Sequence, residues 1–372
     1  MNLFHCTSCG GLIFFENSKC VQCGHSLAFL PDTLEMGALE RGPNGGFMAL
    51  GGEADQNSYR QCCNASHGAC NWAIPAGEDH SFCLSCRLNV LIPDLGSPKN
   101  RELWHKLELA KRRLLYTLLS LRLPLSGEPS LRFQFPAQMP GAPNFQTGHD
   151  QGLITINLAE ADDAVRESLR VSLHEPFRTP LGHFRHEIGH YYWDRLIKNS
   201  PHLESFRKIF GDERQNYKQA LERHYCTGPA PDWSTRCVSA YASAHPWEDW
   251  AETWAHCLHI LDTLETAASF GLRPAPVSPI TRPLADFPET ANDRGDFDAA
   301  LEAWMPLTCA LNSFNRGMGL VDLYPFVLNI NSMEKLRFAH RILMENAAPA
   351  QENAPAPLPF PPQPQARARA VG

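Results

Sequence analysis

The stretch His186-Glu-Ile-Gly-His190 limits what this chain can fold into more strongly than any other feature. In a helix, residues four apart lie on the same face, so both imidazoles can reach one Zn²⁺. Glu187 then lies beside the metal, where a carboxylate can take a proton from a water that the metal acidifies. The stretch therefore predicts a helix that carries two metal ligands and a general base.

The residues around this motif indicate a helix of about five turns. Thr179-Pro180 provides an N-cap followed by proline at the first helical position, and Pro201 lies beyond the expected end. His183 lies on the same face, which leaves open a second interpretation, a His-rich structural helix. Asp194 follows His190 by four residues and could orient a ligand imidazole, although a surface salt bridge is its simpler role.

A third ligand must come from elsewhere, because catalytic zinc usually has three protein ligands and one position open to water. The residue six positions after His190 is Leu196, so that position offers no histidine. A second helix is expected from Pro246, and there Glu248 and Glu252 lie one turn apart on one face. One of them can bind the metal while the other supports a ligand histidine, although this spacing is also common on solvated helix faces.

The cysteines point to further metal sites. Nine of the thirteen lie before residue 90, mostly in CxxC pairs, and no secretion signal precedes them. This clustering favours metal binding over disulfides. The first group consists of two CxxC pairs that together complete a tetrahedral S₄ site for Zn²⁺. Its members are Cys6, Cys9, Cys20 and Cys23.

A second cysteine site is expected further along the chain. Its candidate ligands are Cys62 or Cys63, Cys70, Cys83 and Cys86. His67 or His80 could replace one of these cysteines. Sites with four protein ligands leave no open position, so both cysteine sites should be structural and should fold a segment that has little core of its own.

Charge argues against nucleic acid as a partner. Before residue 96 the chain has four basic residues against nine acidic ones, and thiolate-bound zinc adds negative charge. A phosphate-binding face needs a basic patch, so we expect this segment to contact protein or peptide. The whole chain has a formal net charge of −7, which gives no general attraction to nucleic acid or to anionic membranes.

The N-terminus lacks a basic segment followed by an apolar stretch, and the chain contains no apolar run long enough to span a membrane. We therefore expect a cytoplasmic protein without a membrane partner. The sequence assigns no oligomeric state.

Proline-containing stretches divide the chain into three predicted parts. The stretch Pro93-Asp-Leu-Gly-Ser-Pro98 indicates a boundary between a zinc-binding module at 1–95 and a second domain at 96–346. The apolar content of 43% is sufficient for a sizeable core. From 347 to 372 proline and alanine dominate, which predicts a disordered tail.

The second domain is expected to be mainly helical, which makes the predicted fold class α+β. Leucines at intervals of three and four residues predict an amphipathic helix over 103–121, and 206–225 is also expected to be helical. Alternating and β-branched residues indicate strands near 132–135 and 152–157. The second of these strands is either the sheet edge above the metal, to which an extended peptide could add, or an interior strand.

Two segments, FRHEIGHYYWDRL and SAYASAHPWEDWAETWAHCLHILDTLETA, resemble a bacterial family of zinc-binding metallopeptidases that carry an N-terminal zinc-ribbon module. The resemblance covers most of the chain apart from its proline-rich tail. The site also resembles the catalytic domain of anthrax lethal factor, a gluzincin. There a tyrosine precedes the ligand glutamate by seven residues and a second glutamate follows it by four. Tyr241, Glu248 and Glu252 have these separations.

The resemblance implies a zincin-like fold and a zinc-dependent peptidase that acts on a peptide or protein. Glu248 would join His186 and His190 on the catalytic zinc, with Glu252 as its neighbour and Glu187 as general base. Tyr241 would hydrogen-bond the developing oxyanion. In the resembling family a cysteine follows a Tyr-Arg-x step, which selects Cys62 over Cys63.

The expected cofactors are therefore one catalytic and two structural zinc ions. The alternative is a zinc-stapled binding or scaffold protein whose peptidase fold no longer turns over. The presence of Glu187 and Tyr241 favours the enzyme, because an inactive site tends to lose such residues first.

Overall fold

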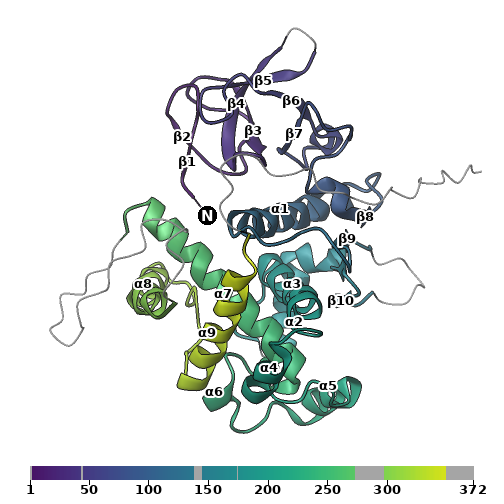
Figure 1. Cartoon of the computed structure of the whole chain (residues 1–372), viewed down its shortest axis with the longest axis vertical. Helices are drawn as coiled ribbons and strands as arrows, with labels where there is room; N and C mark the ends of the chain where they lie inside the picture. The colour runs from purple at the N-terminus through teal and green to yellow at the C-terminus, as the bar shows by residue number, and fades with distance from the viewer. Residues whose placement is uncertain (1, 43–44, 138–144, 174, 273–296, 349–372) are drawn as a thin grey trace, which may run out of the picture.

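The computed structural model describes residues 2–42, 45–137, 145–173, 175–272 and 297–348. Short strands build the N-terminal part and helices build most of the remainder (Figure 1). The predicted α+β fold class is confirmed. The predicted tail, 347–372, lies outside the described residues except for its first two positions.

The N-terminal part contains a small hairpin and a five-stranded antiparallel sheet. The hairpin strands are β1 (Phe4–His5) and β2 (Leu12–Ile13). The sheet has the order β3-β4-β5-β6-β7, with bounds Ser26–Leu30, Glu35–Arg41, Phe47–Leu50, Ser58–Gln61 and Ala73–Pro75. A bridge from Phe29 to Trp72 brings its first and last strands together. The short helical turn η1 (Cys63–His67) directly follows Cys62, and the turn η2 (Cys86–Leu88) begins at Cys86.

A second sheet has four strands in the order β10-β11-β9-β8. Their bounds are Gly148–Asp150, Leu153–Thr155, Arg132–Gln134 and Asn89–Leu91. The strand predicted at 152–157 is therefore interior, because β10 pairs along its outer side. Gly152 makes the tight turn between them, with φ +84° and no space for a Cβ beside the Ser130 carbonyl.

Three helices that each begin with a side-chain cap followed by proline organise much of the rest, and the predicted Thr179 cap is confirmed. Ser97 caps α1 (Pro98–Ser120), Thr179 caps α3 (Pro180–Leu196), and His245 caps α7 (Pro246–Ser269). Proline follows each cap at a position where its missing N–H has no helical partner to lose. The short turns η3 (Leu158–Ala161) and η4 (Tyr241–Ala244) precede α2 (Asp163–Ser172) and α7 respectively.

The region predicted as one helix over 206–225 contains two helices. They are α4 (Leu203–Phe210) and α5 (Tyr217–Thr227). Gly211, with φ +104°, ends the first one in a conformation that continues no helix. The remaining helices are α6 (Trp233–Arg236), α8 (Phe297–Gly317) and α9 (Ile330–Glu345).

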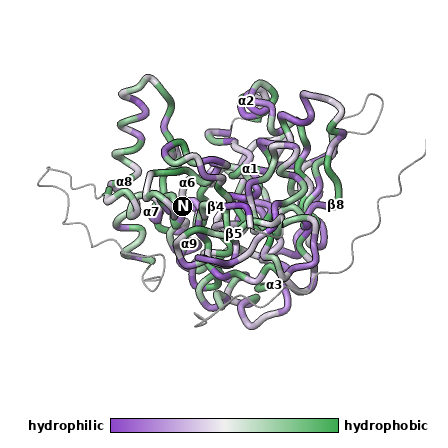
Figure 2. The backbone as a smooth tube through the Cα atoms, turned by 90° about the horizontal axis from the view of Figure 1, so that it is seen from above, coloured by the Kyte–Doolittle hydropathy of each residue, from purple (hydrophilic) through white to green (hydrophobic). Residues whose placement is uncertain are grey.

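One hydrophobic core continues from the N-terminal strands through α1 to α3 and α7. The ring of Tyr116 on α1 lies 6.0 Å from Phe4, 5.6 Å from Phe15 and 5.9 Å from Phe29. Figure 1 shows α1 between the strands and the other helices. A smaller cluster joins α7, α8 and α9 at one side of the molecule (Figure 2). None of the described helices is long and apolar enough to cross a membrane.

Candidate metal centre

The helices α3 and α7 meet in backbone contact at Gly189. A Cβ placed on Gly189 would lie 2.9 Å from the Ala251 Cα and 3.2 Å from the Ala251 carbonyl oxygen. The indole N–H of Trp250 donates to the Gly189 carbonyl oxygen at 2.8 Å. This close approach brings the two histidines of α3 against the first turn of α7.

Three ligand atoms converge there. The His186 Nε2 lies 3.0 Å from the Glu248 Oε2 and 3.2 Å from the His190 Nε2. The His190 Nε2 lies 3.6 Å from the same carboxylate oxygen. In a tetrahedral zinc site with bonds of about 2.0–2.1 Å, ligand atoms are about 3.3 Å apart. The triangle therefore fits a zinc ion that keeps one further position open.

Glu252 supports this cluster from one turn further along α7. Its Oε1 lies 2.8 Å from the His186 Nδ1, and its Oε2 accepts a hydrogen bond from the Ser239 hydroxyl at 2.6 Å. Burial raises the pKa of Glu252, but the hydrogen bond and charge of His186, together with His256 and Ser239, outweigh that effect and lower the pKa to about 2. An ionised Glu252 holds the proton of His186 on Nδ1 and turns Nε2 toward the convergence point.

The electrostatics of His186 also suit a cation. Burial alone would lower the pKa of its imidazole, but hydrogen bonds to Glu248 and Glu252 raise it well above the usual value. The carboxylates of Glu248 and Glu252 thus favour a positive charge at His186. A bound Zn²⁺ would supply that charge instead of a proton.

Glu187 lies within the same buried cluster. Its side chain is 7% exposed, and its Oε2 has no hydrogen-bond partner among the described residues. Burial raises the pKa of Glu187, and the nearby His186 and His190 oppose that increase. A carboxylate whose pKa moves toward neutrality is suited to proton transfer.

Tyr241 also faces the cluster. Its ring lies 5.9 Å from the His186 ring and 5.7 Å from the His224 ring of α5. Burial and the Glu248 carboxylate raise the pKa of Tyr241, so its phenol stays protonated as a hydrogen-bond donor.

Two predicted neighbours lie outside the cluster. Asp194 accepts a hydrogen bond from Lys198 at 3.1 Å and forms the surface ion pair. It does not orient His190, whose Nδ1 has no hydrogen-bond partner among the described residues. His183 turns toward Glu160, with its Nδ1 3.6 Å from the Glu160 Oε2.

Sequence reasoning missed three contributors. Tyr217 of α5 donates its phenol hydrogen to the Glu248 Oε1 at 2.6 Å. Ser239 holds Glu252 as described above. The His149 ring, on the edge strand β10, lies stacked 6.4 Å from the His190 ring. Ser239 lies two residues before Tyr241 and could have been suspected from that closeness. The sequence gives no signal for Tyr217 or His149, which are distant along the chain.

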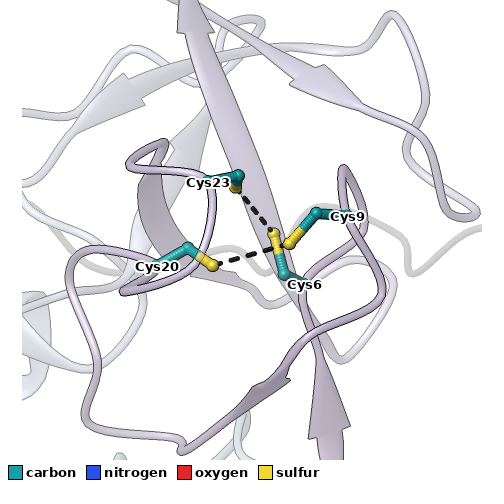
Figure 3. A group of neighbouring side chains, drawn as sticks. All are labelled: Cys6, Cys9, Cys20 and Cys23. Atoms are coloured by element: carbon teal, nitrogen blue, oxygen red, sulfur yellow. Dashed lines mark hydrogen bonds between the residues drawn. The ribbon is translucent and has the colours of Figure 1, made fainter.

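The first cysteine group has the geometry of a tetrahedral metal site (Figure 3). The Sγ atoms of Cys6 and Cys23 are 3.7 Å apart, as are those of Cys9 and Cys20. Zinc–sulfur bonds of about 2.3 Å place ligand sulfurs about 3.8 Å apart. A disulfide would bring the sulfurs to about 2.05 Å. The structure therefore fits a metal and not a cross-link.

The second cysteine group is buried in the main hydrophobic core. It contains Cys62, Cys70, Cys83 and Cys86, whose sulfurs all lie within 4.8 Å of one another. Cys63 is exposed at the start of η1 and stays outside the group. His67 and His80 are exposed and also lie outside it, so neither replaces a cysteine.

Comparison with known proteins identifies both halves of the chain. Residues 100–342 match a family described as "putative zinc-binding metallo-peptidase", and residues 3–97 match a zinc-ribbon domain. The chain belongs to this metallo-peptidase family. Among the described residues, the two cysteine groups lie in the segment that matches the zinc ribbon, and the group of His186, His190 and Glu248 lies in the segment that matches the metallo-peptidase.

Similar proteins occur in mycobacteria. An uncharacterized protein of Mycobacterium tuberculosis and one of Mycobacterium bovis are each 43% identical to this chain over 351 residues. The match covers 93% of this chain and 96% of theirs. No solved structure gave a significant match.

Proposed function

We propose that this protein is a zinc-dependent peptidase of the gluzincin type, with Zn²⁺ held by His186, His190 and Glu248. The observation that carries the proposal is the buried triangle of their three ligand atoms, with sides of 3.0, 3.2 and 3.6 Å. Membership of a zinc-binding metallo-peptidase family supports it. When bound, the metal supplies a Lewis acid that polarises a carbonyl and lowers the pKa of water.

The chain's own residues then have separate roles. Glu187 takes a proton from the attacking water and passes it to the leaving amine. Tyr241 donates a hydrogen bond to the oxyanion that develops on the substrate carbonyl. Glu252, held by Ser239, fixes the orientation of the His186 ring. The substrate class is a peptide or protein.

Glu187→Gln tests these roles, because it keeps the shape of the side chain and removes its basicity. We expect the variant to bind the same amount of zinc and to lose hydrolysis by about 10²- to 10⁴-fold. Proteomic cleavage profiling of the purified protein and the variant measures this loss. Asp194→Asn is the matched control, since it makes the same chemical change on the same helix at the surface ion pair. Undiminished cleavage by Glu187→Gln would refute the assigned roles.

We also propose that each cysteine group holds one structural zinc, which gives three zinc ions per chain. The sulfur distances of 3.5–3.7 Å support this count. Metal analysis of the purified protein should find three, and His186→Ala should reduce the count to two. Three zinc ions in a parent protein that cleaves nothing would favour a binding or scaffold protein with an inactive peptidase fold.

A further inference from the structure

The two oxygens of Glu248 have different environments. Oε2 faces the imidazoles, at 3.0 Å from the His186 Nε2 and 3.6 Å from the His190 Nε2. Oε1 accepts the hydrogen bond from the phenol of Tyr217 at 2.6 Å. One oxygen is thus directed at the convergence point while the other is occupied by a hydrogen-bond donor.

Core packing does not account for the position of Tyr217. Its helix, α5, has Ala220 as its one buried residue, and Tyr217 itself is 38% exposed. The ring is fixed instead by edge contacts with His245 and Trp247, at 5.3 and 5.7 Å, where α7 begins. These contacts place the phenol oxygen against the carboxylate of the next residue, Glu248.

The other phenol at the site has different contacts. Tyr241 lies against the His186 ring at 5.9 Å and shares a hydrogen bond with Tyr225. The Tyr217 proton is given to Glu248, so Tyr217 has no proton left to donate to a substrate. Tyr241 lies beside a metal-ligand ring and can meet the substrate.

We propose that Tyr217 is a positioning residue that keeps the Glu248 Oε1 off the metal. The glutamate then binds through Oε2 alone, and one coordination position stays open for water. Without this hydrogen bond, both carboxylate oxygens can turn to the metal and raise its coordination number. The inference rests on the proposed function in one respect, that Glu248 is a metal ligand.

Tyr217→Phe removes one oxygen atom and keeps the ring. Cobalt(II) can be loaded in place of zinc as a spectroscopic probe, and its visible d–d absorption is stronger in four-coordinate than in five-coordinate sites. We expect the variant to show a weaker d–d band than the parent. We also expect chelator competition to show a 10- to 100-fold lower metal affinity, the usual effect of losing a hydrogen bond to a ligand.

Two variants serve as controls. Tyr225→Phe removes the same atom from the same helix but does not touch Glu248, so it should keep the parent's cobalt spectrum and metal affinity. His186→Ala provides the blank for cobalt at the cysteine groups. An unaltered spectrum and affinity in Tyr217→Phe would overturn the inference, as would an equal change in Tyr225→Phe.

The readout separates this inference from the proposed function. If Tyr217→Phe alters the cobalt spectrum while Glu187→Gln cleaves like the parent, the positioning role stands and the peptidase mechanism fails. If His186→Ala takes up as much cobalt as the parent, the metal centre itself is refuted and the role of Tyr217 with it.

Discussion

Gly189 shows how a single residue affects whether the three candidate ligands, His186, His190 and Glu248, can meet. In an isolated helix, alanine is more favourable than glycine by about 1 kcal/mol. At Gly189 the added Cβ would meet the Cα of Ala251 at 2.9 Å, and both atoms belong to helices that would have to separate. The free-energy cost of this steric clash should therefore exceed the gain in helix propensity.

We predict that Gly189→Ala destabilises the protein by about 1–2 kcal/mol, within the usual range for overpacked cores. Metal affinity at the histidine site should fall as well, because the ligand triangle spreads when α3 and α7 move apart. Urea unfolding and chelator competition measure the two effects. Gly317→Ala at the end of α8 is the control, since its Cβ would meet nothing within 4 Å. Equal stability of the two variants would contradict the argument.

At the level of residues, the sequence could predict contacts that depend on helical spacing. His186, His190 and the pair Glu248 and Glu252 follow from positions four apart on two helices. Tyr217 could not be predicted, because its contact with Glu248 depends on how α5 folds back over the start of α7. Asp194 had a suitable spacing, but Lys198 lies one turn further and takes its carboxylate.

At the level of elements, a buried ion pair attaches α9 to the first turn of α7. The Lys335 Nζ lies 2.5 Å from the Asp249 Oδ2 and also donates to the Arg236 carbonyl oxygen at 2.6 Å. Both side chains are buried. Burial raises the pKa of Asp249 to about 6 even though Lys335 opposes that increase. The ionised form of the Asp249 carboxylate therefore depends strongly on the nearby charge of Lys335.

We predict that Lys335→Met costs about 3–5 kcal/mol, since it leaves the buried Asp249 without its cation. Arg337→Met, on the same helix, should cost no more than about 1 kcal/mol because its ion pair with Asp298 is exposed. Chemical denaturation of both variants tests the difference. If the two losses were alike, the buried pair would not be what holds α9 in place.

Among the elements, those with clear caps could be predicted and those set by tertiary contacts could not. Thr179-Pro180 and Pro246 marked the starts of α3 and α7. The sequence could predict the strand at 153–155 but not its interior place in the sheet, because the neighbouring β10 has no apolar alternation. The helix expected at 206–225 is divided because Gly211 adopts a positive φ.

At the level of the whole molecule, the zinc ribbon and the peptidase region share one core. The ribbon packs on one face of α1 through Tyr116, and the other face of α1 packs toward α3, which carries the histidines. Loss of metal from the zinc ribbon should therefore lower the stability of the peptidase region as well.

We predict that Cys62→Ser removes one zinc ion per chain and lowers the unfolding midpoint of the helices along with that of the ribbon. Circular dichroism follows the helices, and metal analysis gives the zinc content. Cys63→Ser is the control, because the adjacent cysteine is exposed and lies outside the buried group. A helical transition that stays at the parent's midpoint in Cys62→Ser would show that the two regions unfold independently.

The strand β8 connects the cysteines to the sheet beside the histidines. It begins at Asn89, directly after η2 with Cys86, and forms the sheet border opposite β10. Asn89 donates to Glu108 inside α1 at 2.7 Å and accepts from the buried Lys111. During synthesis β8 is made before β9, the described strand that pairs with it. Zinc at the cysteine group would fix the turn that directly precedes β8. We therefore expect zinc bound during synthesis to favour the pairing of β8 with β9 and to limit aggregation through its unpaired edge.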